Sequence, residues 1–187
     1  MSNPKERRFL TRQEIDDGIS AFLLTASSNP DLRFALVGGV ALQAFGYPKG
    51  TKDVDFIITD LPTELYPLER GGPLDIGGAS YFVNKTIEID LIVRRDSYKA
   101  LYEEALGQAV DQAGLPIITL EYLAAVKFLA SRQKDLDAVR WILSEPGRVN
   151  SVWIGMLLER HLGQYAGESW TRFSMPYLKE HPREEYT

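Results

Sequence analysis

Two aspartates at the start of an apolar segment constrain the fold of this chain more than any other feature. Asp53 and Asp55 flank Val54, an apolar run follows to Thr59, and thirteen residues separate Asp53 from the pair Gly38-Gly39. In a strand, residues i and i+2 point to the same face, so both carboxylates would project together. Such a pair repels unless a cation or several donors compensate. The segment therefore predicts either a cation site or an exposed edge strand that acidic residues protect from aggregation.

A third carboxylate lies in the next predicted strand pair. Asp90 sits inside the apolar segment Ile89-Asp90-Leu91-Ile92, and Glu88 would face the same way two residues earlier. The chain has no Cys, and its two His, His161 and His181, are far from these carboxylates in the sequence. Oxygen ligands without Cys or His favour Mg²⁺ over zinc.

Gly38 and Gly39 lie between a predicted strand over 34–37 and a predicted helix over 40–45. Glycines there let the backbone approach an anion, and helix-start N–H groups point toward it; a tight turn without a ligand is an equal alternative. Lys49, Thr51 and Lys52 stand just before Asp53 and are nucleotide-binding candidates. The two lysines would neutralise phosphates, and the alternative is an ordinary solvated loop. A phosphate cradle, a basic loop and metal-binding carboxylates are the parts that a nucleoside triphosphate requires.

Lys127 is the one non-apolar side chain between Tyr122 and Ala130. A buried lysine needs an anionic partner or a pocket that leads to one; the alternative is that its stem carries the ammonium to the surface. Asp135 falls on the same helical face if the helix continues. If the helix breaks near residues 132–133, Asp135 would instead cap the start of the next one.

With 187 residues, the chain has the length of one domain, or of one domain with a small appendage. We expect a core over 1–118 and a helical extension over 119–187, packed as one unit. A capping box at Thr11 and Glu14 predicts the first helix. The segment 60–78 is expected to be a loop, and the tail from Gly163 shows no clear periodicity. The remaining expected strands are 53–59, 81–83, 86–93 and 116–118, and the remaining expected helices are 98–106, 119–131, 135–143 and 152–162.

The charge of the chain limits its partners. There are 21 Lys and Arg against 26 Asp and Glu, a net charge of −5. No global basic field attracts the chain to nucleic acid or to an anionic membrane. No apolar run approaches the roughly 20 residues that span a bilayer, and the N-terminal stretch lacks the apolar core of a leader. We therefore expect a cytoplasmic protein.

The motifs together resemble the nucleotidyltransferases of the DNA polymerase β superfamily, and more closely the bacterial AbiEii-like group. The resemblance covers about residues 34–143. Lys49 stands where the family usually has Arg, which removes bidentate phosphate recognition, and the C-terminal portion is shorter than in the larger members. The matching segments are Gly38-Gly39-Val40-Ala41, Lys49-Gly50-Thr51-Lys52-Asp53-Val54-Asp55, Ile89-Asp90-Leu91-Ile92, Lys127 and Lys134-Asp135-Leu136.

The resemblance implies an α+β fold, a mixed β-sheet flanked by helices with a helical C-terminal part. It implies that Asp53, Asp55 and Asp90 hold Mg²⁺. Gly38 and Gly39 would hold the triphosphate, and Lys127 and Asp135 would act at the nucleotide end. The implied reaction transfers a nucleoside monophosphate from a nucleoside triphosphate to an acceptor hydroxyl.

The acceptor is open at this stage. RNA or protein would suit the toxin of a toxin–antitoxin pair, with a cognate antitoxin as partner. A small-molecule antibiotic is the alternative acceptor, and the acidic net charge favours a cationic one. A third alternative is a non-catalytic, partner-binding module of the same fold, whose mark would be a lost carboxylate.

Overall fold

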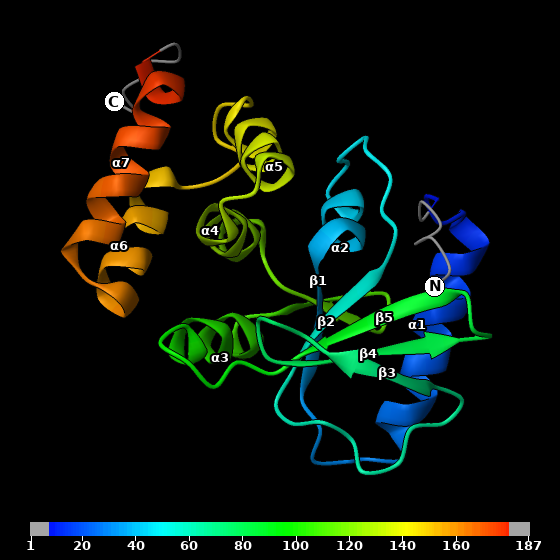
Figure 1. Cartoon of the computed structure of the whole chain (residues 1–187). Helices are drawn as coiled ribbons and strands as arrows, with labels where there is room; N and C mark the ends of the chain where they lie inside the picture. The colour runs from blue at the N-terminus through cyan, green and yellow to red at the C-terminus, as the bar shows by residue number, and fades with distance from the viewer. Residues whose placement is uncertain (1–7, 180–187) are drawn as a thin grey trace, which may run out of the picture. The chain divides into compact units, whose positions relative to one another are not determined.

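The structure is a computed structural model that describes residues 8–179. The N-terminal stretch considered as a leader lies partly outside this range, and His181 lies wholly outside it. The described chain forms two compact units, one built from residues up to 96 with 102–118 and the other from 97–101 with residues from 119 onward. Figure 1 shows the sheet of the first unit and the helices of the second.

The first unit contains a seven-stranded mixed sheet with the strand order β3-β4-β5-β2-β1-β7-β6. β2 runs parallel to β5, and β1 runs parallel to β7, while the other neighbours are antiparallel. The predicted α+β class with a mixed sheet is confirmed. The strands are β1 (Phe34–Val37), β2 (Val54–Ile58), β3 (Glu69–Pro73), β4 (Gly78–Val83), β5 (Ile87–Ile92), β6 (Val110–Gln112) and β7 (Leu115–Ile117).

Helix α1 (Arg12–Ser27) covers one face of this sheet. Phe22 is fully buried and its ring stacks on Phe56 of β2, with the centroids 4.0 Å apart. Gly18 lies so close to the sheet that a Cβ there would meet Cγ2 of Val54 at 3.3 Å. Because Val54 and Asp55 alternate along β2, the aspartate points to the opposite face. The first turn of α2 (Gly38–Ala44) contacts Asp55 on that face.

The capping box that starts α1 is present. Thr11 Oγ1 accepts from the Glu14 N–H at 3.2 Å, and the Thr11 N–H donates to Glu14 Oε2 at 2.8 Å. Hydrogen bonds from the Arg8 guanidinium and then from Thr11 hold the pKa of Glu14 at about 2.

The segment expected to be a loop, residues 60–78, contains a strand. Glu69–Pro73 forms β3 and pairs with β4, and Gly78 is the first residue of β4. Gly71 fits because a Cβ there would lie 2.7 Å from the Ser80 carbonyl oxygen. Residues with weak strand propensity form this edge strand because β4 offers them backbone partners, a contact that the local sequence does not reveal.

The second unit is helical. Its helices are α4 (Leu120–Ala130), α5 (Gln133–Leu143), α6 (Ser151–Leu162) and α7 (Gln164–Lys179), and α3 (Lys99–Gly107) contributes residues to both units. The tail from Gly163, for which the sequence shows no clear periodicity, forms α7. Trp170 and Ser174 are each 1% exposed on its inner face. Because that face mixes aromatic and small polar residues, the sequence shows no clear hydrophobic periodicity there.

Within residues 8–179, no helix combines the length and the apolar character needed to cross a membrane.

Candidate functional site

Three carboxylates meet on the face of the sheet opposite α1. Asp55 of β2 and Asp90 of β5 are direct register partners, and Asp53 immediately precedes β2. One carboxylate oxygen of each lies within 4.8 Å of the other two, and all three residues are half-buried. β2 is a central strand, so the alternative of an acidic edge strand is wrong.

This geometry fits a hard divalent cation. Two unit charges 4.8 Å apart repel by about 3 kcal/mol at an effective dielectric constant of 20. A cation between the carboxylates turns that repulsion into attraction, and an all-oxygen donor set suits Mg²⁺-like ions. Glu88, two residues before Asp90, is 7% exposed and is not part of this group.

Gly38 is glycine because Asp55 occupies the space of its side chain. Its φ is +71°, and a Cβ there would lie 1.8 Å from Asp55 Oδ2 and 2.5 Å from Asp55 Cγ. The strand-to-helix turn therefore passes directly over the carboxylate. Gly39 packs against the site in the same way, because a Cβ at this position would lie 2.4 Å from Thr51 Oγ1.

Thr51 positions Asp53. Its side chain is 6% exposed, and its hydroxyl lies 3.0 Å from Asp53 Oδ1 and 3.1 Å from the Asp53 carbonyl oxygen. The sequence predicts Thr51 as a nucleotide-binding residue, and this stays a prediction; in the structure its hydroxyl is directed at Asp53, a metal-ligand candidate. Thr51 thus joins Gly39 on one side to Asp53 on the other.

The loop before Asp53 carries the two predicted basic residues, Lys49 and Lys52, and both are exposed. Gln43 of α2 donates through Nε2 to the Lys49 carbonyl oxygen at 2.9 Å, which ties the loop to the helix after the glycine turn. Lys52 Nζ lies 5.6 Å from the centroid of the Phe9 ring. Phe9 was not predicted as a site residue from the sequence. The one feature that could have indicated it is an aromatic residue directly after Arg8.

Lys127 and Asp135 lie in the helical unit and bind each other. Lys127 Nζ is 2.9 Å from Asp135 Oδ1, and Arg132 Nε is 2.5 Å from Asp135 Oδ2. The helix breaks at Ser131, whose φ is 55°, so the pair spans the corner between α4 and α5. Lys127 thus has the anionic partner that its apolar surroundings require.

Asp135 is 1% exposed, and two cations determine its charge state. Burial by itself raises the pKa of Asp135, but the hydrogen bond from Arg132 and the charge of Lys127 outweigh it and leave the pKa below its ordinary value. The alternative of a capping aspartate is half right, because the break is present and Asp135 lies in the first turn of α5. Its carboxylate oxygens accept from Lys127 and Arg132 side chains.

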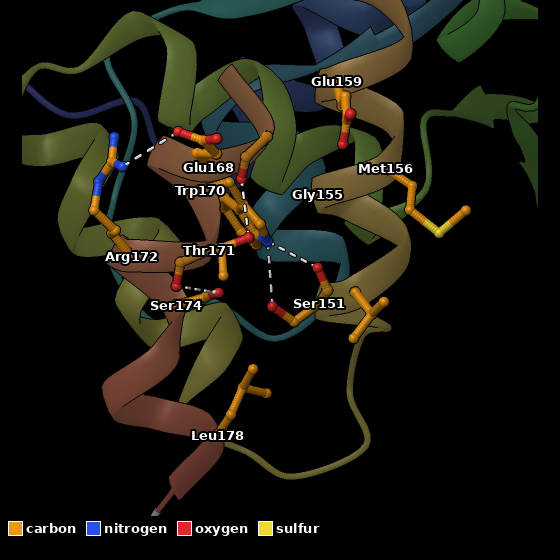
Figure 2. A pocket seen from close by; sticks show the side chains of 12 residues that line it. Ser151, Gly155, Met156, Glu159, Glu168, Trp170, Thr171, Arg172, Ser174 and Leu178 are labelled. Atoms are coloured by element: carbon orange, nitrogen blue, oxygen red, sulfur yellow. Dashed lines mark hydrogen bonds and ion pairs between the residues drawn. The ribbon is translucent and has the colours of Figure 1, made fainter. Parts of the chain in front are cut away.

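A groove of about 450 Å³ between α6 and α7 is a separate feature of the helical unit (Figure 2). Trp170 lies at its base and donates through Nε1 to the Ser151 carbonyl oxygen at 2.8 Å. Met156 and Leu178 are exposed beside it, by 63% and 47%. Its lining includes none of the site residues predicted from the sequence.

Comparison with known proteins identifies the fold. The structure is similar to that of an antigenic nucleotidyltransferase-like protein from Paracoccidioides brasiliensis, with a TM-score of 0.50, 16% identity, and coverage of 92% of this chain and 94% of that one. The JHP933 protein from Helicobacter pylori is similar with a TM-score of 0.48 and 13% identity, over 92% of this chain and 83% of that one. No protein-family model and no curated protein matches the sequence significantly. The chain has the nucleotidyltransferase fold, and a triad of carboxylates lies where a divalent cation fits.

Proposed function

We propose that the protein is a magnesium-dependent nucleotidyltransferase of the AbiEii-like group. The observation that carries the proposal is the meeting of Asp53, Asp55 and Asp90 on one sheet face, within 4.8 Å of one another. Fold alone does not establish activity. The support is the combination of the fold with a donor set that matches the needs of phosphoryl transfer.

In the proposed reaction, the oxygen of an acceptor hydroxyl attacks the α-phosphorus of a nucleoside triphosphate. The bond from that phosphorus to the bridging oxygen breaks, and pyrophosphate leaves. Asp53, Asp55 and Asp90 hold the metal, and Asp90 takes the proton of the acceptor hydroxyl. When bound, Mg²⁺ supplies positive charge that stabilises the attacking and leaving oxygens. Positioning and charge neutralisation then suffice without a Cys, His or Ser nucleophile.

The triphosphate contacts come from the turn and the loop that frame the triad. Gly38 and Gly39 lie against Asp55 and Thr51, and the triphosphate takes its backbone N–H contacts from this turn. Lys49 and Lys52 neutralise phosphate charge from the exposed loop. Thr51 serves this site through Asp53, whose carboxylate accepts from its hydroxyl.

Lys127 and Asp135 enter the proposal through the family resemblance, at the nucleotide end. Their ion pair supports a role in which Asp135 holds the ammonium of Lys127 in place. Lys127 is 14% exposed, so a small part of its side chain remains accessible.

The proposed acceptor is a hydroxyl on RNA or protein, as for the toxin of a toxin–antitoxin pair with a cognate antitoxin. A small-molecule antibiotic acceptor and a non-catalytic partner-binding role are the competing assignments. All three carboxylates of the triad are present, which favours an enzyme over a binding module.

The test incubates the protein with each labelled nucleoside triphosphate and Mg²⁺, and in turn with total RNA, lysate protein and an aminoglycoside panel. We expect label on one acceptor class, and we expect its loss in Asp53→Asn and Asp55→Asn. Asp75→Asn is the matched control, because Asp75 is an exposed carboxylate of the same unit outside the triad. Failure of the unmodified protein to bind Mg²⁺ and nucleotide by calorimetry would refute the enzyme assignment.

A further inference from the structure

Phe9 is an exposed aromatic residue that the proposed reaction leaves without a role. Its side chain is 61% exposed, whereas Phe22 and Phe56 are fully buried. A single exposed phenylalanine is common on protein surfaces. Exposure alone therefore implies nothing; the surroundings of the ring matter.

The backbone and the ring of Phe9 are held against the loop that leads into the acidic site. The N–H of Leu10, the next residue, donates to the Thr51 carbonyl oxygen at 2.8 Å. The ring lies so close to Gly50 that a Cβ there would be 3.0 Å from both Cγ and Cδ1. The ring is thus positioned while most of its surface stays open.

A cation accompanies the ring. Lys52 Nζ lies 5.6 Å from the Phe9 centroid, in the range of a cation–π contact. Lys52 is exposed, and an aromatic ring beside a cation is a combination with which proteins hold single-stranded nucleic acid: the base stacks on the ring, and the cation neutralises the phosphate. The lysine stem is flexible enough to move its charge from the ring to a phosphate.

The place of this pair in the chain connects it to the acidic site. Thr51 lies between Gly50 and Lys52, and its hydroxyl is directed at the Asp53 carboxylate. A nucleotide bound at the ring would therefore touch the same short loop that positions a metal-ligand candidate.

We propose that Phe9 and Lys52 form a nucleotide-stacking site, in which the ring takes a nucleobase and the ammonium takes the adjoining phosphate. The inference deepens the proposed function and rests on it. Two sources supply the same chemistry, the base of the nucleoside triphosphate itself and a base of a single-stranded RNA acceptor, and the experiment separates them.

The experiment compares the full chain with Phe9→Leu, Phe9→Trp and Lys52→Gln. One arm measures binding of a non-hydrolysable nucleoside triphosphate with Mg²⁺ by calorimetry, and the other measures binding of a single-stranded oligoribonucleotide by fluorescence anisotropy. Phe9→Leu removes the ring on which one base would stack. It should weaken binding of the ligand that stacks there roughly five- to hundredfold, and leave binding of the other ligand unchanged. Phe9→Trp should retain the affinity, and its added fluorescence should be quenched by that same ligand.

Lys52→Gln gives a readout that a merely structural role would not move. If its ammonium contacts a phosphate of the RNA, the slope of log affinity against log salt should become shallower by about 0.7. If the ligand is the triphosphate, Lys52→Gln should weaken that arm and leave the RNA arm unchanged.

The helical unit supplies a matched control. Tyr165 is 79% exposed, and Arg172 Cζ lies 5.9 Å from its ring centroid, a similar pair in the other unit. Tyr165→Leu should leave both arms unchanged, and unaltered Mg²⁺ binding in Phe9→Leu shows that the site is intact. Equal affinities of Phe9→Leu and the unmodified protein in both arms would overturn the inference. The inference would also be overturned if the unmodified protein bound neither the nucleotide nor the RNA. If the unmodified protein bound no Mg²⁺ either, the proposed function would be refuted as well.

Discussion

Replacing Gly38 with alanine tests the link between the glycine turn and the acidic triad. The Cβ of Gly38→Ala would lie 1.8 Å from Asp55 Oδ2, and Asp55 Cγ and Cβ would lie at 2.5 and 2.9 Å. Real Cβ contacts essentially never fall below 3.0 Å, so the oxygen must retreat by at least the difference, 1.2 Å. Rotation of the carboxylate alone does not relieve the contact, because Asp55 Cβ is also too near.

The expected result has two parts with different magnitudes. Alanine at a φ of +71° costs about 1–2 kcal/mol of stability, which for a chain of this length lowers the Tm by roughly 2–8 °C. Displacement of one metal ligand by about 1 Å should lower the Mg²⁺ or Mn²⁺ affinity by roughly a hundredfold. Differential scanning calorimetry measures the first effect, and titration calorimetry with Mn²⁺ measures the second.

Gly46→Ala separates the two effects. Gly46 has a φ of +90°, and a Cβ there meets nothing within 4 Å. Gly46→Ala should therefore show the loss of Tm and retain the metal affinity. If Gly38→Ala binds Mn²⁺ as tightly as the unmodified protein, Asp55 is not held under the turn as described. If Gly46→Ala loses metal affinity to the same extent, general destabilisation explains both.

Three further predictions concern groups that support the site or the fold. Thr51→Val keeps the volume but removes the hydroxyl directed at Asp53, so metal affinity should fall about tenfold in titration calorimetry; unchanged affinity would mean that another group positions Asp53. Asp135→Asn leaves the buried end of Lys127 without its anion and should cost about 3–5 kcal/mol in urea denaturation at pH 7, and a cost below 1 kcal/mol would contradict a structural role for the pair. The folded-state pKa of Glu14, about 2, is below the unfolded value of about 4.3. The ionised carboxylate therefore adds to the free energy of unfolding above pH 4.3, and this stabilisation is lost as pH falls through 2. In Glu14→Gln, the free energy of unfolding should fall less steeply between pH 4.3 and pH 2 than in the unmodified protein. An unchanged slope would mean that the Glu14 carboxylate does not stabilise the fold.

Local sequence predicted most of the regular elements, because each carries its own signal. The turn Asn84-Lys85 separates two β-rich segments, and both residues have positive φ between β4 and β5. The capping box formed by Thr11 and Glu14 predicted the start of α1. β3 was missed because Glu69–Pro73 has little strand propensity and depends on β4 for its hydrogen bonds. The periodicity of α7 was not recognised because its buried positions Gly167, Trp170 and Ser174 follow helical spacing but include only one large apolar side chain.

The sequence by itself determined the composition of the candidate site, since the types and order of Gly38, Asp53, Asp55 and Asp90 indicate a phosphate-and-metal site before any fold is known. Only the tertiary structure decided which of these groups meet. Asp90 joins the other two because β5 pairs with β2 in register, a contact between segments far apart in the chain.

The tertiary structure also assigned tasks that the sequence left open. The hydroxyl of Thr51 is buried beside Asp53 and directed at its carboxylate, a contact that spacing along the chain does not reveal. Lys127 binds Asp135 across a helix break, and helical spacing alone could not show which partner the lysine takes. Spacing along a chain determines which side chains share a face, whereas strand register and helix breaks determine which of them come within bonding distance.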